Sequence, residues 1–203
     1  MIRHVLALLL SAATFGGCAV NQTTAVRYYQ AGEAALAQGN LLHAREMFSR
    51  AFINTQLDHM GPEAEAQVLA KLGRVYGNLC QYEDAEKEFM QSIDASAKAF
   101  GASSTNSFPE RLELAQLSYD IGQYEKSVAY FDQAFPYGIA VIEKNDAPSY
   151  VAIIKDYSDA LARTGRPDRA TEGMAKVKLL EGKVATQTVG KGGEYVRYPT
   201  SCK

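Results

Sequence analysis

The side chains that could perform catalysis or bind a metal are few, and their spacing matches no known site. The three histidines are His4, His43 and His59, and none has a Cys, Asp or Glu partner at a spacing typical of metal ligands. The sequence contains no H-E-x-x-H, G-x-S-x-G or P-loop motif. The glycine-rich stretch 190–193 lacks the flanking strand and helix that a phosphate-binding loop needs, so we interpret it as part of a flexible tail. The sequence therefore predicts a protein that is not an enzyme and that has no cofactor and no metal site.

Composition excludes several other classes of protein. The 203 residues are 47% hydrophobic, with 21 basic and 23 acidic side chains and a net charge of −2. This balance is typical of a globular domain and unlike disordered, collagen-like or polytopic membrane proteins. Without a clustered basic face, we expect no nucleic-acid partner.

The elements that position the remaining side chains come from a short phrase that recurs four times. Each copy has a turn residue, a small residue five positions later and a large residue four positions after that. The copies are Gly39/Ala44/Phe48, Cys80/Ala85/Phe89, Gly122/Ser127/Phe131 and Gly165/Ala170/Met174. The large residues follow one another at steps of 41, 42 and 43 residues. A period in this range indicates a repeat array whose neighbouring units share one continuous core.

Each copy has the pattern of two helices joined by a turn. Before the second turn, Leu69, Leu72, Gly73 and Tyr76 follow offsets of three and four, which is one helical stripe. After each turn, the small and large residues are four apart and therefore share one helical face. A turn glycine suits the end of a helix, because that position often requires a left-handed backbone. We expect the large side chain of each copy to fill the space beside its small partner.

These patterns predict one all-α domain, an α-solenoid of about four helix–turn–helix hairpins over residues 24–185. The expected hairpins are 24–58, 63–100, 109–144 and 148–185. Residues 186–203 are predicted to form a flexible C-terminal tail.

The recurring phrase resembles the tetratricopeptide repeat (TPR), whose unit carries Leu-Gly, Tyr, then Ala-x3-Phe. The second copy matches best, with Leu72-Gly73, Tyr76, Ala85 and Phe89. The standard TPR unit is about 34 residues long, and the longer period here is similar to the repeats of kinesin light chains. The resemblance implies a concave groove, lined by the first helix of each hairpin, that binds a protein or peptide. The groove residues it implies are Tyr29, Glu33, Arg74, Asn78, Gln116, Tyr119, Lys155, Asp159 and Arg163.

The first 17 residues have the pattern of a secretion signal. Arg3 and His4 precede a nine-residue apolar run from Val5 to Ala13, far short of the ~20 residues that a membrane span needs. The stretch 15–18, Phe-Gly-Gly-Cys, resembles a bacterial lipobox, in which the signal is removed before a cysteine that becomes lipidated. The alternative is an ordinary cleaved signal with an incidental cysteine. The resemblance implies a lipid anchor at Cys18, a short tether over 18–23, and a location on the outer membrane facing the periplasm.

If Cys18 is lipidated, Cys80 and Cys202 are the two remaining thiols, in a compartment where disulfides persist. From Gly182 to Cys202 the chain can extend about 66 Å at ~3.3 Å per residue, so the two thiols can reach each other. Two readings stay open, a Cys80–Cys202 disulfide or two independent thiols.

Two functions remain open. The first is a lipid-anchored adaptor or scaffold of the bacterial envelope, for example an assembly factor for an envelope complex, that binds partners through its groove. The second is an accessory regulator that recruits one envelope enzyme and would change its rate.

Overall fold

The computed structural model describes residues 17–184 and 197–202. Within these ranges the chain forms eight α-helices and one 3-10 turn, which confirms the prediction of an all-α fold. The elements are α1 (Gly17–Ala37), α2 (Leu41–Leu57), α3 (Pro62–Asn78), α4 (Tyr82–Phe100), η1 (Thr105–Ser107), α5 (Phe108–Asp120), α6 (Tyr124–Asn145), α7 (Ala147–Arg163) and α8 (Pro167–Val184).

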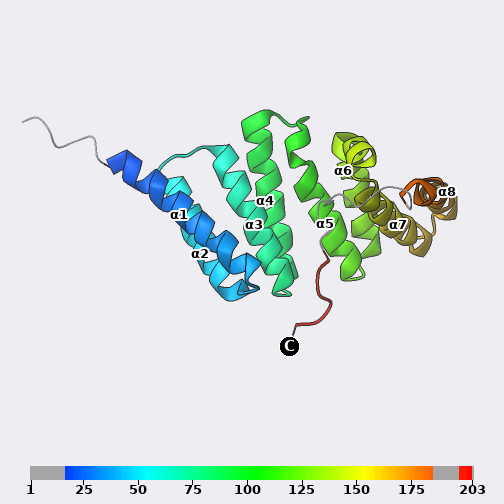
Figure 1. The fold of residues 1–203 in the computed structure, drawn as a ribbon, viewed down its shortest axis with the longest axis horizontal. Coiled ribbons are helices and arrows are strands. Elements are labelled where there is room, and N and C mark those ends of the chain that lie inside the picture. The colour runs from blue at the N-terminus through cyan, green and yellow to red at the C-terminus, as the bar shows by residue number, and fades with distance from the viewer. Residues whose placement is uncertain (1–16, 185–196, 203) are drawn as a thin grey trace, which may run out of the picture.

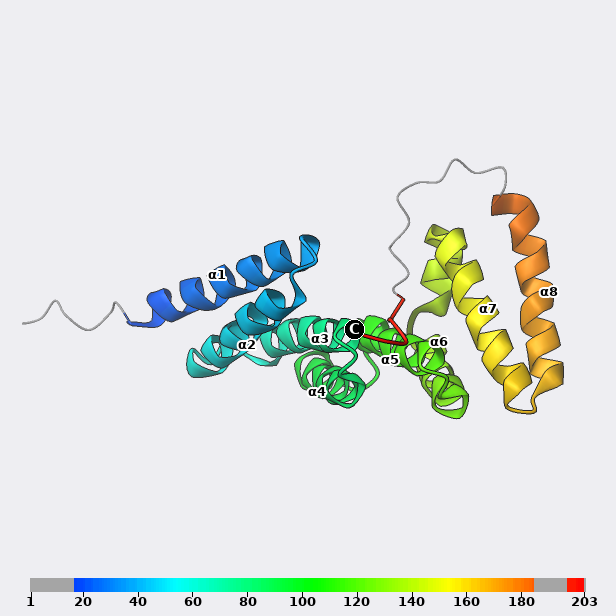
Figure 2. The ribbon, with the colours of Figure 1, turned by 90° about the horizontal axis from the view of Figure 1, so that it is seen from below.

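The helices pack as four consecutive hairpins along a curved array (Figure 1). Figure 2 shows the curvature from the side: α1, α3 and α5 follow one another along the inside of the curve with α2 and α4 behind them, and α8 lies on the outer side of α7. We call the surface formed by α1, α3, α5 and α7 the concave face. Because side chains of all four hairpins meet there, the concave face is the surface on which one ligand can contact several repeats at once.

The turn within each hairpin requires a left-handed backbone. Gly39, Gly122 and Gly165 have φ angles of 72°, 78° and 74°, and Cys80 occupies the same position with φ 57°. A β-carbon in this conformation costs roughly 1–2 kcal/mol, which explains why the other three turns use glycine. Cysteine at this position bears that cost, and its side chain is bonded to Cys202 of the C-terminus.

The core of the first three hairpins follows the small–large pattern of the sequence. Phe48, Phe89 and Phe131 are 0%, 1% and 0% exposed, which confirms their predicted packing. Glycine at 32 and 73 makes room for the first two rings, because a β-carbon there would overlap the phenylalanine side chain. The two helices of a hairpin can thus approach closely because a glycine on one helix faces the large phenylalanine ring of the other.

In the fourth hairpin the prediction for Met174 is wrong. Its side chain is 42% exposed, whereas Val177, three residues further along α8, is 1% exposed and packs with Tyr150, Val151 and Ile154. The register of α8 therefore turns Met174 out of the core. This fits its place in the last hairpin, where no further repeat in the described part of the chain covers α8.

The N-terminal boundary also differs from the sequence prediction. Helix α1 begins at Gly17, so residues 18–23, predicted as a short tether, are helical and continuous with the first hairpin. The physical reason is that residues 18–23 contain neither glycine nor proline, so nothing interrupts the helical hydrogen bonds. The predicted signal lies almost entirely outside the described residues, as does the side chain of Cys18. No helix within the described residues is long and apolar enough to cross a bilayer.

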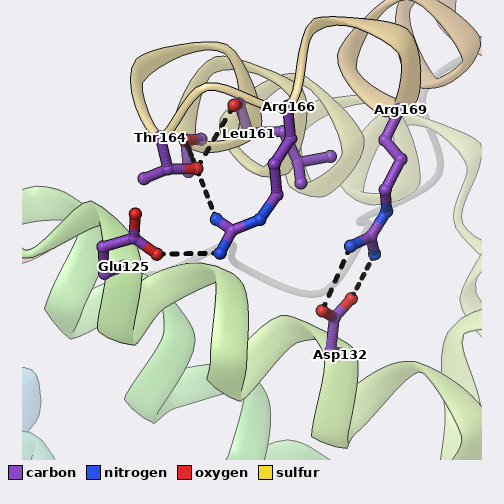
Figure 3. A network of polar contacts seen from close by, with 7 residues as sticks. Glu125, Asp132, Leu161, Thr164, Arg166 and Arg169 are labelled. Atoms are coloured by element: carbon purple, nitrogen blue, oxygen red, sulfur yellow. Dashed lines mark hydrogen bonds and ion pairs between the residues drawn. The ribbon is translucent and has the colours of Figure 1, made fainter.

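Polar contacts join the third and fourth hairpins at the outer edge of the array (Figure 3). Arg166 in the turn before α8 donates to Glu125 of α6 at 3.0 Å and to Thr164 at 2.6 Å. Arg169 of α8 pairs with Asp132 of α6 at 2.6 Å. These side chains are largely solvent-exposed, so each pair contributes about 0–1 kcal/mol and mainly fixes how α8 lies against α6.

Candidate binding groove

The concave face is partly filled by the chain's own C-terminus. Residues 197–202, here called the C-terminal segment, lie in a non-helical conformation against α3 and α5 (Figure 2). The prediction of a flexible tail is wrong for this segment, and residues 186–196 lie outside the described part of the chain. The physical reason is that Arg197, Tyr198 and Cys202 each have a specific partner on the concave face.

Tyr198 enters a closely fitting pocket. Its side chain is 4% exposed and packs in one apolar cluster with Phe89, Leu114 and Leu117. A β-carbon at residue 77 would overlap the tyrosine ring, so Gly77 forms the wall that the ring lies on. We call the site formed by Gly77, Glu113, Leu114 and Leu117 the tyrosine pocket.

The hydroxyl of Tyr198 also has a hydrogen-bond partner within the tyrosine pocket. It donates a hydrogen bond to Glu113, and Glu113 accepts a second bond from the guanidinium of Arg74. Burial, together with the neighbouring charge of Glu113, raises the pKa of Tyr198 well above its usual value. The hydroxyl therefore stays protonated and acts as a donor at any physiological pH.

Arg197 is held by two carboxylates. Its guanidinium donates to Asp120 at 3.0 Å and pairs with Asp156 at 2.8 Å, and both carboxylate side chains are 8% exposed. The same guanidinium lies 5.8 Å from the ring centre of Tyr119, within the range of a cation–π contact. We call Tyr119, Asp120 and Asp156 the arginine clamp. Since its members come from α5 and α7, one side chain of the segment connects the third and fourth hairpins.

The backbone of the C-terminal segment is fixed as well. The amide of Tyr198 donates to Asp120 at 2.8 Å, and the hydroxyl of Tyr82 donates to the carbonyl of Pro199 at 2.6 Å. Further along, Cys202 forms a disulfide with Cys80, with Cα atoms 5.9 Å apart. Of the two alternatives left open for these cysteines, the structure has the Cys80–Cys202 disulfide. The end of the C-terminal segment is therefore covalently attached to the second hairpin.

Three predicted groove residues lie against the C-terminal segment. Arg74 borders the tyrosine pocket and Tyr119 belongs to the arginine clamp. The carbonyl oxygen of Asn78 is 3.7 Å from Cys202 Sγ, and its amide nitrogen donates to the carbonyl of Arg74 at 2.8 Å. The stripe predicted on α3 therefore lies under the bound segment.

Two other predicted residues lie on α1, at the N-terminal end of the concave face. Tyr29 packs edge-on against Phe48 at 5.6 Å between ring centres, and Glu33 pairs with Lys71 of α3 at 3.0 Å. Both side chains are partly buried. The Tyr29 contact lies within the first hairpin, whereas the Glu33–Lys71 pair joins the first hairpin to the second.

Two of the three remaining predicted residues on α7, Lys155 and Asp159, border an open cleft, and Arg163 pairs with Asp159. Asp159 accepts from Tyr119 at 2.9 Å and from Arg163 at 2.6 Å, while the exposed Lys155 pairs with Glu181 at 2.6 Å. The cleft has a volume of about 550 Å³, and Lys155, Asp159 and Tyr119 are among its lining residues. It continues the concave face beyond the arginine clamp.

Gln116 was predicted as a groove residue, and the structure corrects this. Its side chain is 2% exposed, within a buried run of α5 from Leu114 to Ser118. Its amide donates to Asp120 at 2.9 Å. Gln116 therefore lies beneath the groove surface and positions a carboxylate of the arginine clamp, because α5 is covered on several sides and not on one face alone.

Sequence reasoning missed the acidic residues that bind the segment. Glu113 and Asp120 lie three before and four after Gln116, on the same helical stripe, and Asp156 directly follows Lys155. Extending the predicted stripe by one turn in each direction would have found the first two. Among the described residues, no cluster of three or more His, Cys, Asp or Glu side chains could hold a metal ion.

Comparisons with known proteins agree with this architecture. The family model described as a tetratricopeptide repeat matches residues 66–98, which cover most of α3 and α4. The chain is similar to the crystal structure of BtubC (BKLC) from P. vanneervenii, with a TM-score of 0.69 and 12% identity over 90% of this chain and 71% of that one. It is also similar to nearly identical TPR-like repeats of a Podosopora anserina protein described as a kinesin light chain, with a TM-score of 0.60 and 18% identity over 84% of both chains. No curated protein matches the sequence.

The fold is thus TPR-like and similar to that of kinesin-light-chain repeats, as the sequence predicted. TPR solenoids generally serve as scaffolds for protein–protein interaction, and they are generally not enzymes. At 12–18% identity the likeness extends to the fold alone.

Proposed function

We propose that this chain is a lipid-anchored adaptor of the bacterial envelope that binds an extended segment of another protein on its concave face. One observation carries the proposal: the concave face already holds a non-helical stretch of polypeptide, residues 197–202, through contacts from three hairpins. Tyr82 and Gly77 come from the second hairpin, Glu113 and Asp120 from the third, and Asp156 from the fourth.

The chemistry of the concave face supports peptide binding. Tyrosine and arginine, the residue types most often found as binding hot spots, line it at Tyr119, Arg74 and Arg163. Backbone recognition is present too, since Tyr82 and Asp120 bond main-chain atoms of the segment. The cleft beside Lys155 extends this surface, so a longer partner segment can continue past the residues that the C-terminus covers.

The envelope location is proposed from the signal-like first 17 residues and Cys18. A cysteine carrying two or more acyl chains anchors a protein stably, whereas one chain binds only marginally. The Cys80–Cys202 disulfide is in keeping with this location, because disulfides persist in the periplasm and are rare in the cytosol. We propose attachment to the outer membrane, facing the periplasm.

The binding surface can be tested by site-specific photo-crosslinking in cells that naturally make this chain. A benzophenone side chain at position 155 is expected to crosslink the partner, because Lys155 is exposed beside the cleft of the concave face. The measurement is the yield of adduct on a denaturing gel, identified by mass spectrometry.

The matched control places the same group at position 98, where exposed Lys98 lies in the last turn of the outer helix α4. We expect at least a fivefold higher adduct yield from position 155. Both positions are tested with and without Cys202→Ser, which frees the C-terminal segment from Cys80. Equal yields from the two positions in both backgrounds, or no adduct from position 155 in either, would show that the concave face is not the binding surface.

The anchor has a separate test. Cys18→Ser is expected to move most of the full-length protein from the membrane fraction to the soluble fraction, because the acylated sulfur is lost. The measurement is immunoblotting of both fractions after a high-salt wash, with Cys202→Ser as the cysteine control. Retention of Cys18→Ser on washed membranes would refute the lipid anchor.

A further inference from the structure

The C-terminal segment occupies a site whose shape and charge fit one pair of side chains. The tyrosine pocket has a glycine wall, apolar sides and an acceptor for the hydroxyl at Glu113. The adjoining arginine clamp offers two carboxylates and an aromatic ring to a guanidinium. Phenylalanine in the pocket would leave Glu113 without its hydroxyl donor, and lysine in the clamp would lack the planar fork that bridges two carboxylates.

The site also selects an extended backbone. Asp120 accepts from the amide of Tyr198, and Tyr82 donates to the carbonyl of Pro199. Proline after the tyrosine disfavours a helical conformation at Tyr198, so an Arg-Tyr-Pro sequence is already biased toward the bound form. Main-chain contacts of this kind do not depend on the rest of the sequence, and another protein's segment can make them equally well.

The disulfide holds the occupant in place. Cys202 lies on the exposed end of the segment, and Cys80 takes up a left-handed turn position that the other three hairpins give to glycine. The Cys80 side chain is partly buried at this costly position, and its bonded partner is Cys202. The bond therefore closes the concave face with the chain's own residues.

We propose that the concave face is a recognition site for extended Arg-Tyr-Pro segments of partner proteins, which residues 197–202 fill in cis while the Cys80–Cys202 disulfide is intact. This inference rests on the proposed function and adds the partner's chemistry and its control. A dithiol reductant opens the site. One thiolate of the reductant attacks a sulfur of the Cys80–Cys202 bond and forms a mixed disulfide. The second thiol of the reductant then breaks that mixed disulfide. In total, two electrons and two protons pass from the reductant to Cys80 and Cys202, which become thiols, while the reductant becomes a cyclic disulfide.

Reduction alone gives partial access. After reduction the segment is still part of the same chain, so it binds as an intramolecular ligand at an effective concentration on the order of 1 mM. A free peptide of the same sequence must compete with that concentration. Substituting Arg197 and Tyr198 removes the competitor and gives full access.

The test measures binding of a fluorescein-labelled hexapeptide, Val-Arg-Tyr-Pro-Thr-Ser, by fluorescence anisotropy. It compares the oxidised full-length protein, the same protein reduced with dithiothreitol, and the variant Arg197→Ala/Tyr198→Ala/Cys202→Ser. We expect no saturable binding to the oxidised protein, and at least tenfold tighter binding to the variant than to the reduced protein. A control peptide, Val-Ala-Ala-Pro-Thr-Ser, is expected to bind the variant at least tenfold more weakly than the hexapeptide.

Circular dichroism of the variant and binding by the reduced wild-type protein separate lost binding from lost folding. The proposal is overturned if neither the helical variant nor the reduced protein binds the hexapeptide, or if the oxidised protein binds it equally well. It is also overturned if reduction yields a dimer, since the segment would then fill the site of a second copy. Crosslinking from position 155 together with absent hexapeptide binding would reject this inference and leave the proposed function standing.

Discussion

Replacing Phe131 with alanine is expected to lower the free energy of unfolding by about 3–5 kcal/mol. The ring is fully buried and lies 5.6 Å from Phe135 and 5.5 Å from Tyr157, measured between ring centres. Tyr157 belongs to α7, so the cavity would open between the third and fourth hairpins. In a repeat array, stability depends on such contacts between neighbouring units, and within the described residues the fourth hairpin packs against the third alone.

The loss would be a large share of total stability, which is typically 5–15 kcal/mol for a natural protein. Urea denaturation followed by circular dichroism at 222 nm measures it. Phe100→Ala is the matched control, because the same side chain is removed where it is 42% exposed. We expect the control to cost no more than about 1 kcal/mol. Similar losses in the two variants would contradict the view that Phe131 is central to the core.

The architecture was predictable because its determinants repeat within short windows of sequence. A small residue and a phenylalanine four positions apart define one helical face, and three of the four copies keep that pair in the core. The turn glycines mark the ends of helices in the same way. Met174 shows the limit of such reasoning, since the last copy has lost the phenylalanine and its register could not be set by analogy with the others.

The occupied site was much less predictable, because it depends on contacts between residues far apart in the sequence. Tyr198 and Glu113 are 85 residues apart, and no local pattern around either one indicates the other. The tail is glycine-rich and has no helical periodicity, so its composition favoured disorder. A cysteine in place of a turn glycine at residue 80 was the one local signal, and it pointed to a possible disulfide without showing where the segment would lie.

Removing the Cys80–Cys202 disulfide is expected to lower the free energy of unfolding by about 2–5 kcal/mol. The bond joins residues 122 positions apart, so it closes a loop that contains the whole third and fourth hairpins. In the chain-entropy account, a closed loop of this size restricts the unfolded chain by up to roughly 5 kcal/mol. The bond also keeps Arg197 in the arginine clamp, which connects α5 to α7.

Two single substitutions separate the disulfide from the backbone at residue 80. Cys202→Ser removes the bond and leaves a β-carbon at φ 57°, whereas Cys80→Gly removes the bond and relieves that conformation. Cys80→Gly is therefore expected to be more stable than Cys202→Ser by about 1 kcal/mol. Urea denaturation of both variants, and of the wild-type protein with and without dithiothreitol, provides the comparison. If the reduced and oxidised wild-type proteins unfold at the same urea concentration, the disulfide does not stabilise the array, because its loop would then impose no cost on the unfolded chain.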